Sequence, residues 1–387
     1  MKIRKLPIYI LAIINIAIVM GLWLSGFAGW LNPNSWHWLS LIGYAFPAFL
    51  LATLASLVVW VFIKKRYLII PFIGLIVAYV PVTLYCPINF QSNNDEATND
   101  GATNAQPDTE KLSGSKNVSS SLTIVSYNTC NWGCDKAAPD STTNDDTKKQ
   151  MMADFFRSTN ADIIALQECG TYLDALNDAY AYRDSLKNHN AGGCNVMIYS
   201  RYPILRRENL NIDSKGNVAG AFWLNINGTE TIVINTHLET MGFSMAERQR
   251  FGDMVHGNEQ LRDSVKQTSH TIFGKILHAS KIRAMQADII ARFIEAHQGM
   301  PIIVAGDFND IPQSYTYHTI SRNLTDCYRQ CALGPGFTYR HYTMRARIDN
   351  ILCTQHFTPL AAHVDNTITI SDHQPIVASL VHNSVDK

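Results

Sequence analysis

The chain has 387 residues, with 32 basic and 32 acidic side chains and therefore no formal net charge. This length allows one large domain with a full core and an additional region. The balanced charge argues against a dedicated nucleic-acid binder, which needs an excess of Lys and Arg on one face, but it does not exclude a nuclease.

The N-terminal region consists of long apolar runs. No Asp, Glu, Lys or Arg occurs between residues 6 and 63, or again between residues 67 and 94. A helix needs about 20 apolar residues to cross the hydrocarbon core of a membrane. We therefore predict an all-α region with three transmembrane spans at residues 7–30, 36–63 and 68–86. A cleaved signal peptide is the alternative for the first run, but the two later runs would still make a membrane protein.

Basic residues flank these runs on one side only. They stand before the first run and between the second and third: Lys2, Arg4, Lys5, Lys64, Lys65 and Arg66. Short loops rich in Lys and Arg stay in the cytoplasm. An odd number of spans then places the rest of the chain outside the cytoplasm. The predicted location is the cell (inner) membrane, with several passes.

The next segment, residues 91–120, is rich in Asn, Ser, Thr, Asp and Gly. Such a composition cannot offset its ordering entropy by burying apolar surface, so a flexible linker is expected. About 30 flexible residues span roughly 30 Å, which would let the following domain reach the bilayer surface. The predicted organisation is a transmembrane region at 1–90, this linker at 91–120, and a catalytic domain at 121–387.

From residue 122 onward, short apolar runs alternate with helical patterns. Strands are predicted at 122–127, 163–166, 195–200, 219–226, 230–238, 302–305, 348–354 and 374–381. Helices are predicted at 148–157 and 281–295, the latter with apolar residues on one face at 3.6-residue spacing. Many strands with few helices indicate two packed sheets flanked by helices, an α/β fold.

Polar side chains stand where these predicted strands end. Each alone is more often a helix cap, a turn or a satisfied hydrogen-bonding residue, but the arrangement repeats at most strands. Active sites tend to form where strands end and loops begin. The residues in question are Asn128, Glu168, His237, Asp307, Asn309, Asp349, Asp372 and His373.

Six ordered segments around these residues resemble the motifs of the endonuclease/exonuclease/phosphatase superfamily. The resemblance extends from about residue 122 to 382 and implies a four-layer α/β/β/α sandwich and a phosphoric ester hydrolase. The segments are Ser126-Tyr127-Asn128, Ala161-Asp162-Ile163-Ile164-Ala165-Leu166-Gln167-Glu168, Asn235-Thr236-His237-Leu238, Gly306-Asp307-Phe308-Asn309, Arg347-Ile348-Asp349-Asn350-Ile351 and Ser371-Asp372-His373-Gln374-Pro375.

The resemblance also implies a divalent metal ion. By this comparison Glu168 should bind the metal, with Asn128 and Asp372 near it. Oxygen ligands of this kind suit Mg²⁺ or Mn²⁺. The metal is therefore expected to be one of these two ions.

The remaining site residues receive catalytic roles from the same resemblance. Asp307 and Asn309 should position the attacking water and the phosphate. His373, oriented by Asp349, should act as the base or hold the phosphoryl oxygen. His237 should protonate the leaving oxygen, since imidazoles serve as acid or base near neutral pH. The AP endonucleases of the superfamily lack a histidine at this position, so a role in DNA repair is not expected.

Three interpretations of the function remain open. The first is a phosphatase or phosphodiesterase acting on a lipid-linked or small phosphoester, with the lipid bilayer as a partner. The second is an extracytoplasmic nuclease for DNA or RNA, which predicts a basic groove near the two histidines. The third is a catalytically inactive membrane receptor. The arginines that could line the groove are Arg201, Arg283, Arg340, Arg345 and Arg347.

Two further features carry open alternatives. The eight cysteines include two pairs at C-x-x-x-C spacing, Cys130/Cys134 and Cys327/Cys331, without the neighbouring ligands that a zinc site needs. An exported domain would form one or two disulfides, and a cytosolic one would keep buried thiols. Residues 241–280 form either a pair of packed surface helices or a lid over the substrate pocket.

Overall fold

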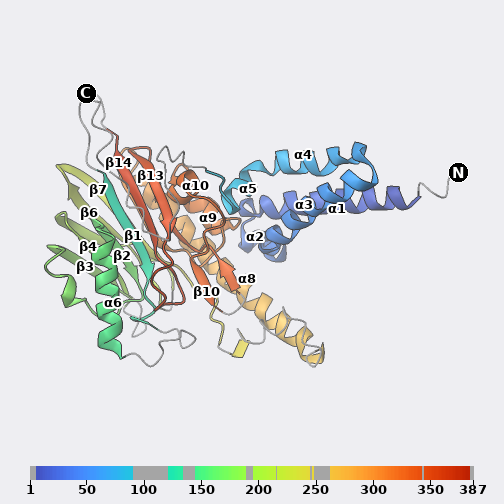
Figure 1. Ribbon diagram of the computed structural model, residues 1–387. Coiled ribbons are helices and arrows are strands. Elements are labelled where there is room, and N and C mark those ends of the chain that lie inside the picture. Colours follow the sequence, from blue (N-terminus) through green and yellow to red (C-terminus); the bar gives the residue numbers. More distant parts are fainter. Residues whose placement is uncertain are drawn as a thin grey trace, which may run out of the picture.

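The computed structural model describes residues 6–89, 121–133, 144–188, 195–214, 216–244, 246–247, 262–341 and 344–383 (Figure 1). The predicted linker at 91–120 lies outside the described residues, as does most of 245–261.

The N-terminal region is helical throughout. Its α-helices are α1 (Leu6–Gly26), α2 (Pro33–Ser40), α3 (Phe46–Ile63), α4 (Ile69–Val77) and α5 (Tyr79–Tyr85). Within the described residues, Leu6–Gly26 and Pro33–Ile63 are long and apolar enough to cross a membrane. A third span is present if Lys65–Val77 and Tyr79–Tyr85, bent by 65°, count as one. Of the three predicted spans, the first two correspond to helices long enough to cross a membrane, and the third corresponds to the bent pair of helices.

The three apolar runs of this region pack side by side. Trp60 of α3 donates a hydrogen bond to Oδ1 of Asn15 in α1 at 2.9 Å. At the other end of the bundle, a Cβ on Gly26 would lie 2.9 Å from Pro81 in α5. Buried polar groups within a bilayer need such internal partners. The helices α1, α3 and α4 accordingly extend away from the strand-rich domain as one bundle (Figure 1).

The strand-rich domain contains two six-stranded sheets. The first has the order β13-β14-β1-β2-β4-β3. The strands β1 and β2 are parallel, and β14 and β4 flank them in antiparallel orientation. The bounds are β1 (Leu122–Asn128), β2 (Ile163–Gln167), β3 (Tyr182–Lys187), β4 (Asn195–Ser200), β13 (Phe357–Val364) and β14 (Ile376–His382).

The second sheet has the order β5-β6-β7-β8-β12-β9. The strands β7 and β8 are parallel, and β12 runs antiparallel to β8. A separate hairpin joins β10 (Tyr339–His341) to β11 (Met344–Ala346). The bounds of the sheet are β5 (Ile204–Asn209), β6 (Ala219–Ile226), β7 (Thr229–His237), β8 (Ile302–Asp307), β9 (Thr325–Asp326) and β12 (Asp349–Cys353).

Helices cover the outer face of each sheet. The core between the sheets includes Ile124 from the first and Phe222 from the second. Phe156 of α6 (Asp145–Ser158) belongs to a second core on the outer face of the first sheet. On the outer face of the second sheet, α8 (Arg262–Ala296) and α9 (Tyr315–Ile320) form a third core. The short helix α10 (Cys327–Cys331) follows β9. This arrangement confirms the predicted four-layer α/β/β/α sandwich.

Helix α6 begins where its sequence favours a start. The side chain of Asn144 accepts a hydrogen bond from the backbone nitrogen of Thr147 at 2.8 Å, and Asp145 and Asp146 occupy the first turn. Such a cap satisfies a free helix N–H, and acidic residues there favour the positive end of the helix dipole. The predicted helix at 148–157 is therefore confirmed, with an earlier first turn.

Two sequence predictions require correction. The predicted helix at 281–295 is only the second half of α8, which begins at Arg262. In the insertion at 241–280, residues 246–247 and the residues from Arg262 onward are helical, and residues 248–261 lie outside the described part of the chain, so both readings of this insertion stay open. Strands β3, β5 and β13 were also not predicted. All three are edge strands with mostly exposed or alternating side chains, so they lack the apolar runs on which the prediction relied.

The strand-rich domain is docked directly on the N-terminal helices, the predicted membrane region. Arg347 donates to the carbonyl oxygen of Leu84 at 3.1 Å, and Asn89 donates to the carbonyl oxygen of Ala332 at 2.9 Å. Ile88 and Leu333 also form an isolated β-bridge. These contacts join the end of α5 and the residues after it to the residues that follow α10 and precede β12.

Candidate active site

The topology brings the predicted site residues of the first sheet to one edge. Parallel pairing places Asn128 beside Gln167, so Glu168 follows directly at the same edge. The antiparallel strand β14 begins at this edge, with Ile376 opposite Ser126. The loop that contains Asp372 and His373 precedes β14 and therefore meets the ends of β1 and β2.

The second sheet supplies the facing residues. His237 and Asp307 are register partners in the parallel pair of β7 and β8. Asp349, at the start of the antiparallel β12, is the partner of Asp307 on its other side. Three neighbouring strands thus bring an imidazole and two carboxylates together.

Gly306 makes this close pairing possible. Its φ of +141° lies in a region that L side chains rarely adopt. A Cβ on this residue would lie 2.0 Å from the carbonyl oxygen of Thr236. Glycine is therefore required immediately before Asp307.

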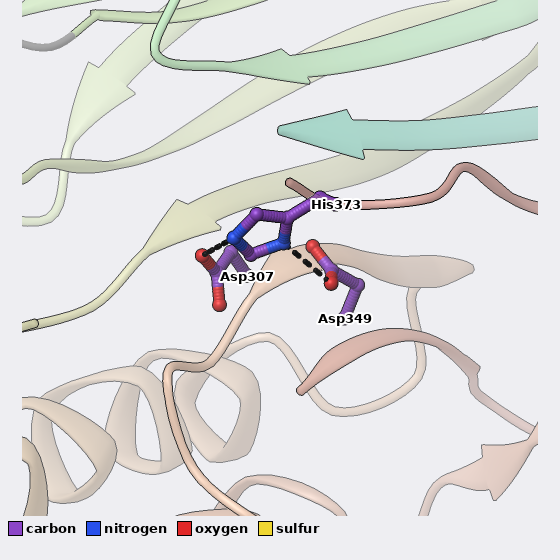
Figure 2. Close-up of side chains that lie close together, drawn as sticks. All are labelled: Asp307, Asp349 and His373. Carbon is purple, nitrogen blue, oxygen red and sulfur yellow. Dashed lines mark hydrogen bonds and ion pairs between the residues drawn. The ribbon is translucent and has the colours of Figure 1, made fainter. Parts of the chain in front are cut away.

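His373 and Asp349 form a buried ion pair (Figure 2). Nδ1 of His373 lies 2.9 Å from Oδ2 of Asp349, and Nε2 lies 3.7 Å from Oδ2 of Asp307. Burial lowers the pKa of His373, but the carboxylates of Asp349 and Asp307 raise it more, to about 10. The ring is therefore an imidazolium at neutral pH, with one nitrogen held and the other directed at Asp307.

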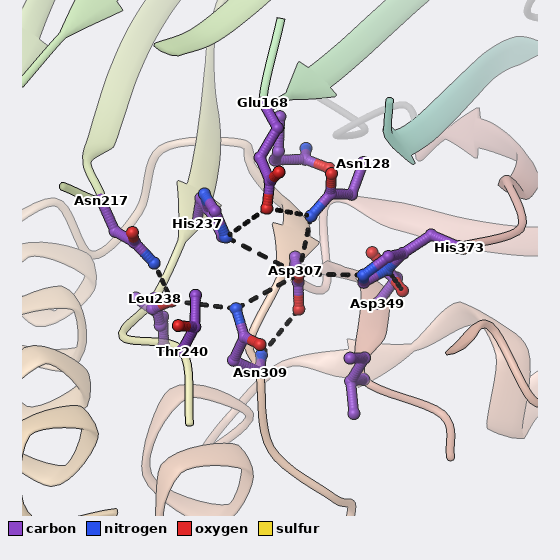
Figure 3. A network of polar contacts seen from close by, with 12 residues as sticks. Asn128, Glu168, Asn217, His237, Leu238, Thr240, Asp307, Asn309, Asp349 and His373 are labelled. Atoms are coloured by element: carbon purple, nitrogen blue, oxygen red, sulfur yellow. Dashed lines mark hydrogen bonds and ion pairs between the residues drawn. The ribbon is translucent and has the colours of Figure 1, made fainter. Parts of the chain in front are cut away.

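Asp307 is at the centre of the network (Figure 3). Burial and the neighbouring Asp349 raise its pKa to about 6, against the opposing effect of His373 and His237. A carboxylate with this pKa is ionised at neutral pH and is a stronger base than an ordinary aspartate.

Asn128 and Glu168 complete the network on the side of the first sheet. Nδ2 of Asn128 donates to Oε1 of Glu168 at 3.1 Å and to Oδ2 of Asp307 at 3.0 Å. The amide oxygen of Asn128 accepts from the backbone nitrogen of Cys130 at 3.1 Å. Asn128 therefore turns its nitrogen, and not its oxygen, toward the two carboxylates. Glu168 has a φ of 49°, an unusual value for a non-glycine residue and one that marks local strain at functional sites.

The ring of His237 is buried and has no hydrogen-bond partner among the described residues. Its side chain is 1 % exposed. Nε2 lies 3.4 Å from Oε1 of Glu168 and 3.8 Å from Oδ2 of Asp307, and neither ring nitrogen is hydrogen-bonded. Nε2 of His237 thus lies within ion-pair distance of both carboxylates when the ring is protonated.

Asn309 is fixed beside Asp307. Its backbone nitrogen donates to Oδ1 of Asp307 at 2.7 Å, and its Nδ2 donates to the carbonyl oxygen of Leu238 at 3.0 Å. Asn217, which the sequence reasoning missed, donates to the same carbonyl (Figure 3). A single Asn after an exposed loop gives no sequence signal for this role.

Asp372 lies in the same loop as His373. Its carbonyl oxygen accepts from the backbone nitrogen of Arg340 at 3.0 Å, and its carboxylate contributes to the raised pKa of His373. Tyr339 forms an isolated β-bridge with His373, and the two ring centroids are 5.1 Å apart. Tyr339 is thus a further neighbour of the site that the sequence did not suggest.

Within the described residues, one group of potential metal ligands was found. Ligand atoms of Asp307, Asp349 and His373 all lie within 4.8 Å of one another. This buried group of two carboxylates and an imidazole could hold a metal ion, and without one the same atoms form a charge network.

The predicted basic groove is wrong for three of its five arginines. Arg283 and Arg347 are buried and pair with Asp310 and Asp326 at 3.0 and 2.8 Å. Arg201 pairs with Asp162, which precedes β2 and lies at the opposite end of that strand from Glu168. Of the five arginines, Arg340 and Arg345 are left as candidates to line a basic groove. The prediction failed for the other three because the sequence does not show which charged side chains form internal ion pairs.

The comparison with protein families agrees with this geometry. The profile of the Endonuclease/Exonuclease/phosphatase family matches residues 115–373. The chain belongs to this family. A second profile, a domain of unknown function (DUF8431), matches residues 8–85, within the N-terminal helices. No curated protein matches the chain.

Solved structures resemble about two thirds of this chain at low sequence identity. A Bacteroides vulgatus endonuclease/exonuclease/phosphatase is 20% identical, with 68% of this chain and 100% of that chain covered at a TM-score of 0.49. The Bacteroides thetaiotaomicron mannosyl-6-phosphatase Bt3783 is 20% identical over 67% of this chain and 99% of that chain, at 0.48. D. rerio TDP2, solved with a single-strand DNA product, is 15% identical over 68% and 100%, at 0.47.

Proposed function

We propose that this chain is a membrane-anchored, divalent-metal-dependent phosphoester hydrolase. The observation that supports it best is the meeting of two imidazoles and a basic carboxylate at one edge of two sheets. One imidazole, His373, is charged and held by Asp349, whereas the other, His237, is buried without a hydrogen bond in the described chain. Asp307 lies between them.

A divalent cation fits this donor set. The side chain of Glu168 is 21% exposed, whereas those of Asp307 and Asp349 are buried. Glu168 is therefore the carboxylate that a hydrated Mg²⁺ or Mn²⁺ would reach, with Asn128 and Asp372 proposed beside it. Asn128 would offer its amide oxygen to the ion only after a flip of the amide, since its nitrogen now faces Glu168. When bound, the ion would neutralise charge on the phosphoryl and leaving oxygens.

The protein residues would carry out the remaining steps. His373, as an imidazolium, would hold a phosphoryl oxygen with Nε2, so its proposed role is electrostatic and not that of a base. Asp307 would take a proton from the attacking water while the oxygen of this water bonds to phosphorus. As the bond from phosphorus to the leaving oxygen breaks, His237 would donate a proton to that oxygen. Asn309 would position the phosphate.

Several observations support a catalytic domain outside the cytoplasm. The helices of the N-terminal region contact the strand-rich domain at one end of their bundle. Lys64, Lys65 and Arg66 lie at the other end, and their side chains are exposed. The positive-inside rule favours that end in the cytoplasm. Cys130 is disulfide-bonded, which suits an oxidising compartment. By contrast, Cys327 and Cys331 are free.

A lipid-linked or small phosphoester is the favoured substrate. An open cleft of about 590 Å³ has Asn89, Phe337, Arg340 and His363 among its lining residues. Of these lining residues, Asn89 is just past the membrane region, and the backbone nitrogen of Arg340 donates to the carbonyl oxygen of Asp372 in the catalytic loop. Arg340 and Arg345 face each other across the hairpin with no carboxylate partner in the described chain. Two unneutralised arginines suit a phosphate group.

The experiment uses the full-length chain in lipid nanodiscs with Mg²⁺ or Mn²⁺. A polyprenyl diphosphate, a soluble phosphomonoester and single-stranded DNA are offered separately, and released phosphate or DNA fragments are measured. We expect phosphate release, lowered in R340A/R345A most for the lipid, and unchanged in the surface control K187A. DNA cleavage alone would favour the nuclease reading. No reaction with any probe, and no metal binding, would favour the inactive receptor.

A further inference from the structure

Tyr44 of the membrane region reaches the catalytic loop of the domain. Its hydroxyl donates to Oδ1 of Asp310 at 2.8 Å. Asp310 directly follows Asn309 in the loop that begins with Asp307. A residue more than 260 positions earlier in the chain thus bonds to the catalytic loop.

Asp310 is a buried charge with a complete set of partners. Arg283 of α8 pairs with its Oδ2 at 3.0 Å, and the Arg283 side chain is 0% exposed. Thr316 donates to the same oxygen at 2.9 Å, and the backbone nitrogen of Ile311 donates to Oδ1 at 3.0 Å. Because a buried carboxylate tolerates the loss of a donor poorly, Tyr44 is part of what fixes Asp310 in place.

This network also includes the residues that follow β7, and Asn309 is bonded to one of them. Arg283 donates from a second nitrogen to the carbonyl oxygen of Glu239 at 2.9 Å. Asn309 donates to the carbonyl of the preceding residue, Leu238. The segment after His237 and the loop after Asp307 are thus both bonded to buried Arg283. Arg283 also donates to the hydroxyl of Tyr44 at 3.5 Å.

A second contact reaches the other side of the site. Arg347 donates to the carbonyl oxygen of Leu84 at 3.1 Å, at the end of α5. Arg347 precedes Asp349, the partner of His373, by two residues. The membrane region therefore contacts the chain beside both Asn309 and Asp349.

Glycines allow the two regions to approach this closely. A Cβ on Gly29 would lie 2.9 Å from the carbonyl oxygen of Ser314, and a Cβ on Gly43 would lie 3.0 Å from that of Gln313. Both carbonyls belong to the segment between the catalytic loop and α9. Figure 1 shows α2 and α5 at the junction with α8, α9 and α10.

From these contacts we infer that the membrane region is a structural part of the active site, with Tyr44 as a positioning residue that acts on Asn309 through Asp310. This assigns a role to residues 8–85, the domain of unknown function, beyond anchoring. The inference rests on the proposed hydrolase activity for its kinetic readout only.

The first test is Y44F in the full-length chain, with bis(4-nitrophenyl) phosphate and Mn²⁺ as probes. Phe keeps the ring and removes only the hydroxyl, so kcat should fall about tenfold while KM stays within about twofold. T316V removes another donor to Asp310 and should lower kcat in the same way. Y67F is the matched control, because Tyr67 makes its contacts with Arg66 and Trp60 at the other end of the bundle.

The second test does not depend on activity. A protease site placed within residues 91–120 is cleaved in the folded, membrane-bound chain. We expect the catalytic fragment to stay in the membrane fraction, and to be released more readily when G43V obstructs the close approach. A fragment that leaves the membrane with unchanged kcat would overturn the inference, as would a Y44F chain with wild-type kcat. A wild-type chain that hydrolyses no phosphoester would instead contradict the proposed function.

Discussion

Nδ1 of His373 lies 2.9 Å from Oδ2 of Asp349, and both side chains are buried. The carboxylate fixes the orientation of the ring and keeps it charged, so Nε2 faces Asp307. The sequence left two roles open for His373, a base or a group that holds the phosphoryl oxygen. Its raised pKa supports the second.

D349N should therefore weaken catalysis without removing the site. The amide cannot stabilise the imidazolium, so the pKa of His373 should fall and kcat should drop about 100-fold or more. If the charged ring is the active form, the alkaline limb of the pH–rate profile should begin at lower pH in D349N. Steady-state kinetics from pH 6 to 10 provide the measurement.

The matched control is D365N. Asp365 also lies near a histidine, His363, at 4.0 Å, but the side chain of this histidine is 60% exposed, whereas that of His373 is buried. Wild-type kinetics in D365N and an unshifted alkaline limb in D349N would together contradict an imidazolium role for His373.

The same pair makes the stability of the metal-free protein depend on pH. The pKa of His373 is raised to about 10 in the folded state, above the ordinary value of about 6.5. Its contribution to stability is thus fully present below about pH 6.5 and is lost as pH rises toward 10. H373Q should remove this part of the slope, which is at most about 1.4 kcal/mol per pH unit. Thermal unfolding in EDTA measures it, and H363Q should keep the wild-type slope.

G306A should destabilise the domain by about 3 kcal/mol or more. The new methyl group would meet the backbone of Thr236, and φ at this position is unfavourable for Ala. G274A is the control, because nothing lies within 4 Å of a Cβ at Gly274 in α8 and Ala favours a helix. Equal melting temperatures for the two variants would show that β7 and β8 are not paired this closely.

E168Q and H237Q should separate metal binding from proton transfer. If Glu168 reaches the cation, E168Q should weaken Mn²⁺ binding by about tenfold or more, because a carboxylate ligand is lost. H237Q should keep the wild-type affinity and lose at least about 100-fold in kcat. Calorimetric titration with Mn²⁺ gives the affinities. Weakened Mn²⁺ binding in H237Q with wild-type binding in E168Q would show that Glu168 is not the metal ligand.

Much of the site could be predicted from sequence, because each strand that carries it is a buried apolar run that ends in a polar residue. The run before Asp307 is an example: all six residues of β8 are buried. The edge strand β5 was not predicted, since Arg206, Arg207 and Glu208 are exposed and interrupt any apolar pattern.

Long-range pairing is what the sequence could not provide. Arg283 and Arg347 were expected in an exposed groove, yet they are buried against Asp310 and Asp326. Tyr44 has the composition of a membrane span around it, and nothing local indicates a partner 266 positions away. Such contacts follow from the docking of the two regions and not from local pattern.

The most direct measurement is phosphoester hydrolysis by the full-length chain in nanodiscs, with and without Mg²⁺ or Mn²⁺, for wild type and D307N. The imidazoles and carboxylates of the site predict metal-dependent release of the leaving group by wild type, abolished by EDTA and in D307N. Hydrolysis that continues undiminished in EDTA or in D307N would contradict a metal-dependent reaction at this site.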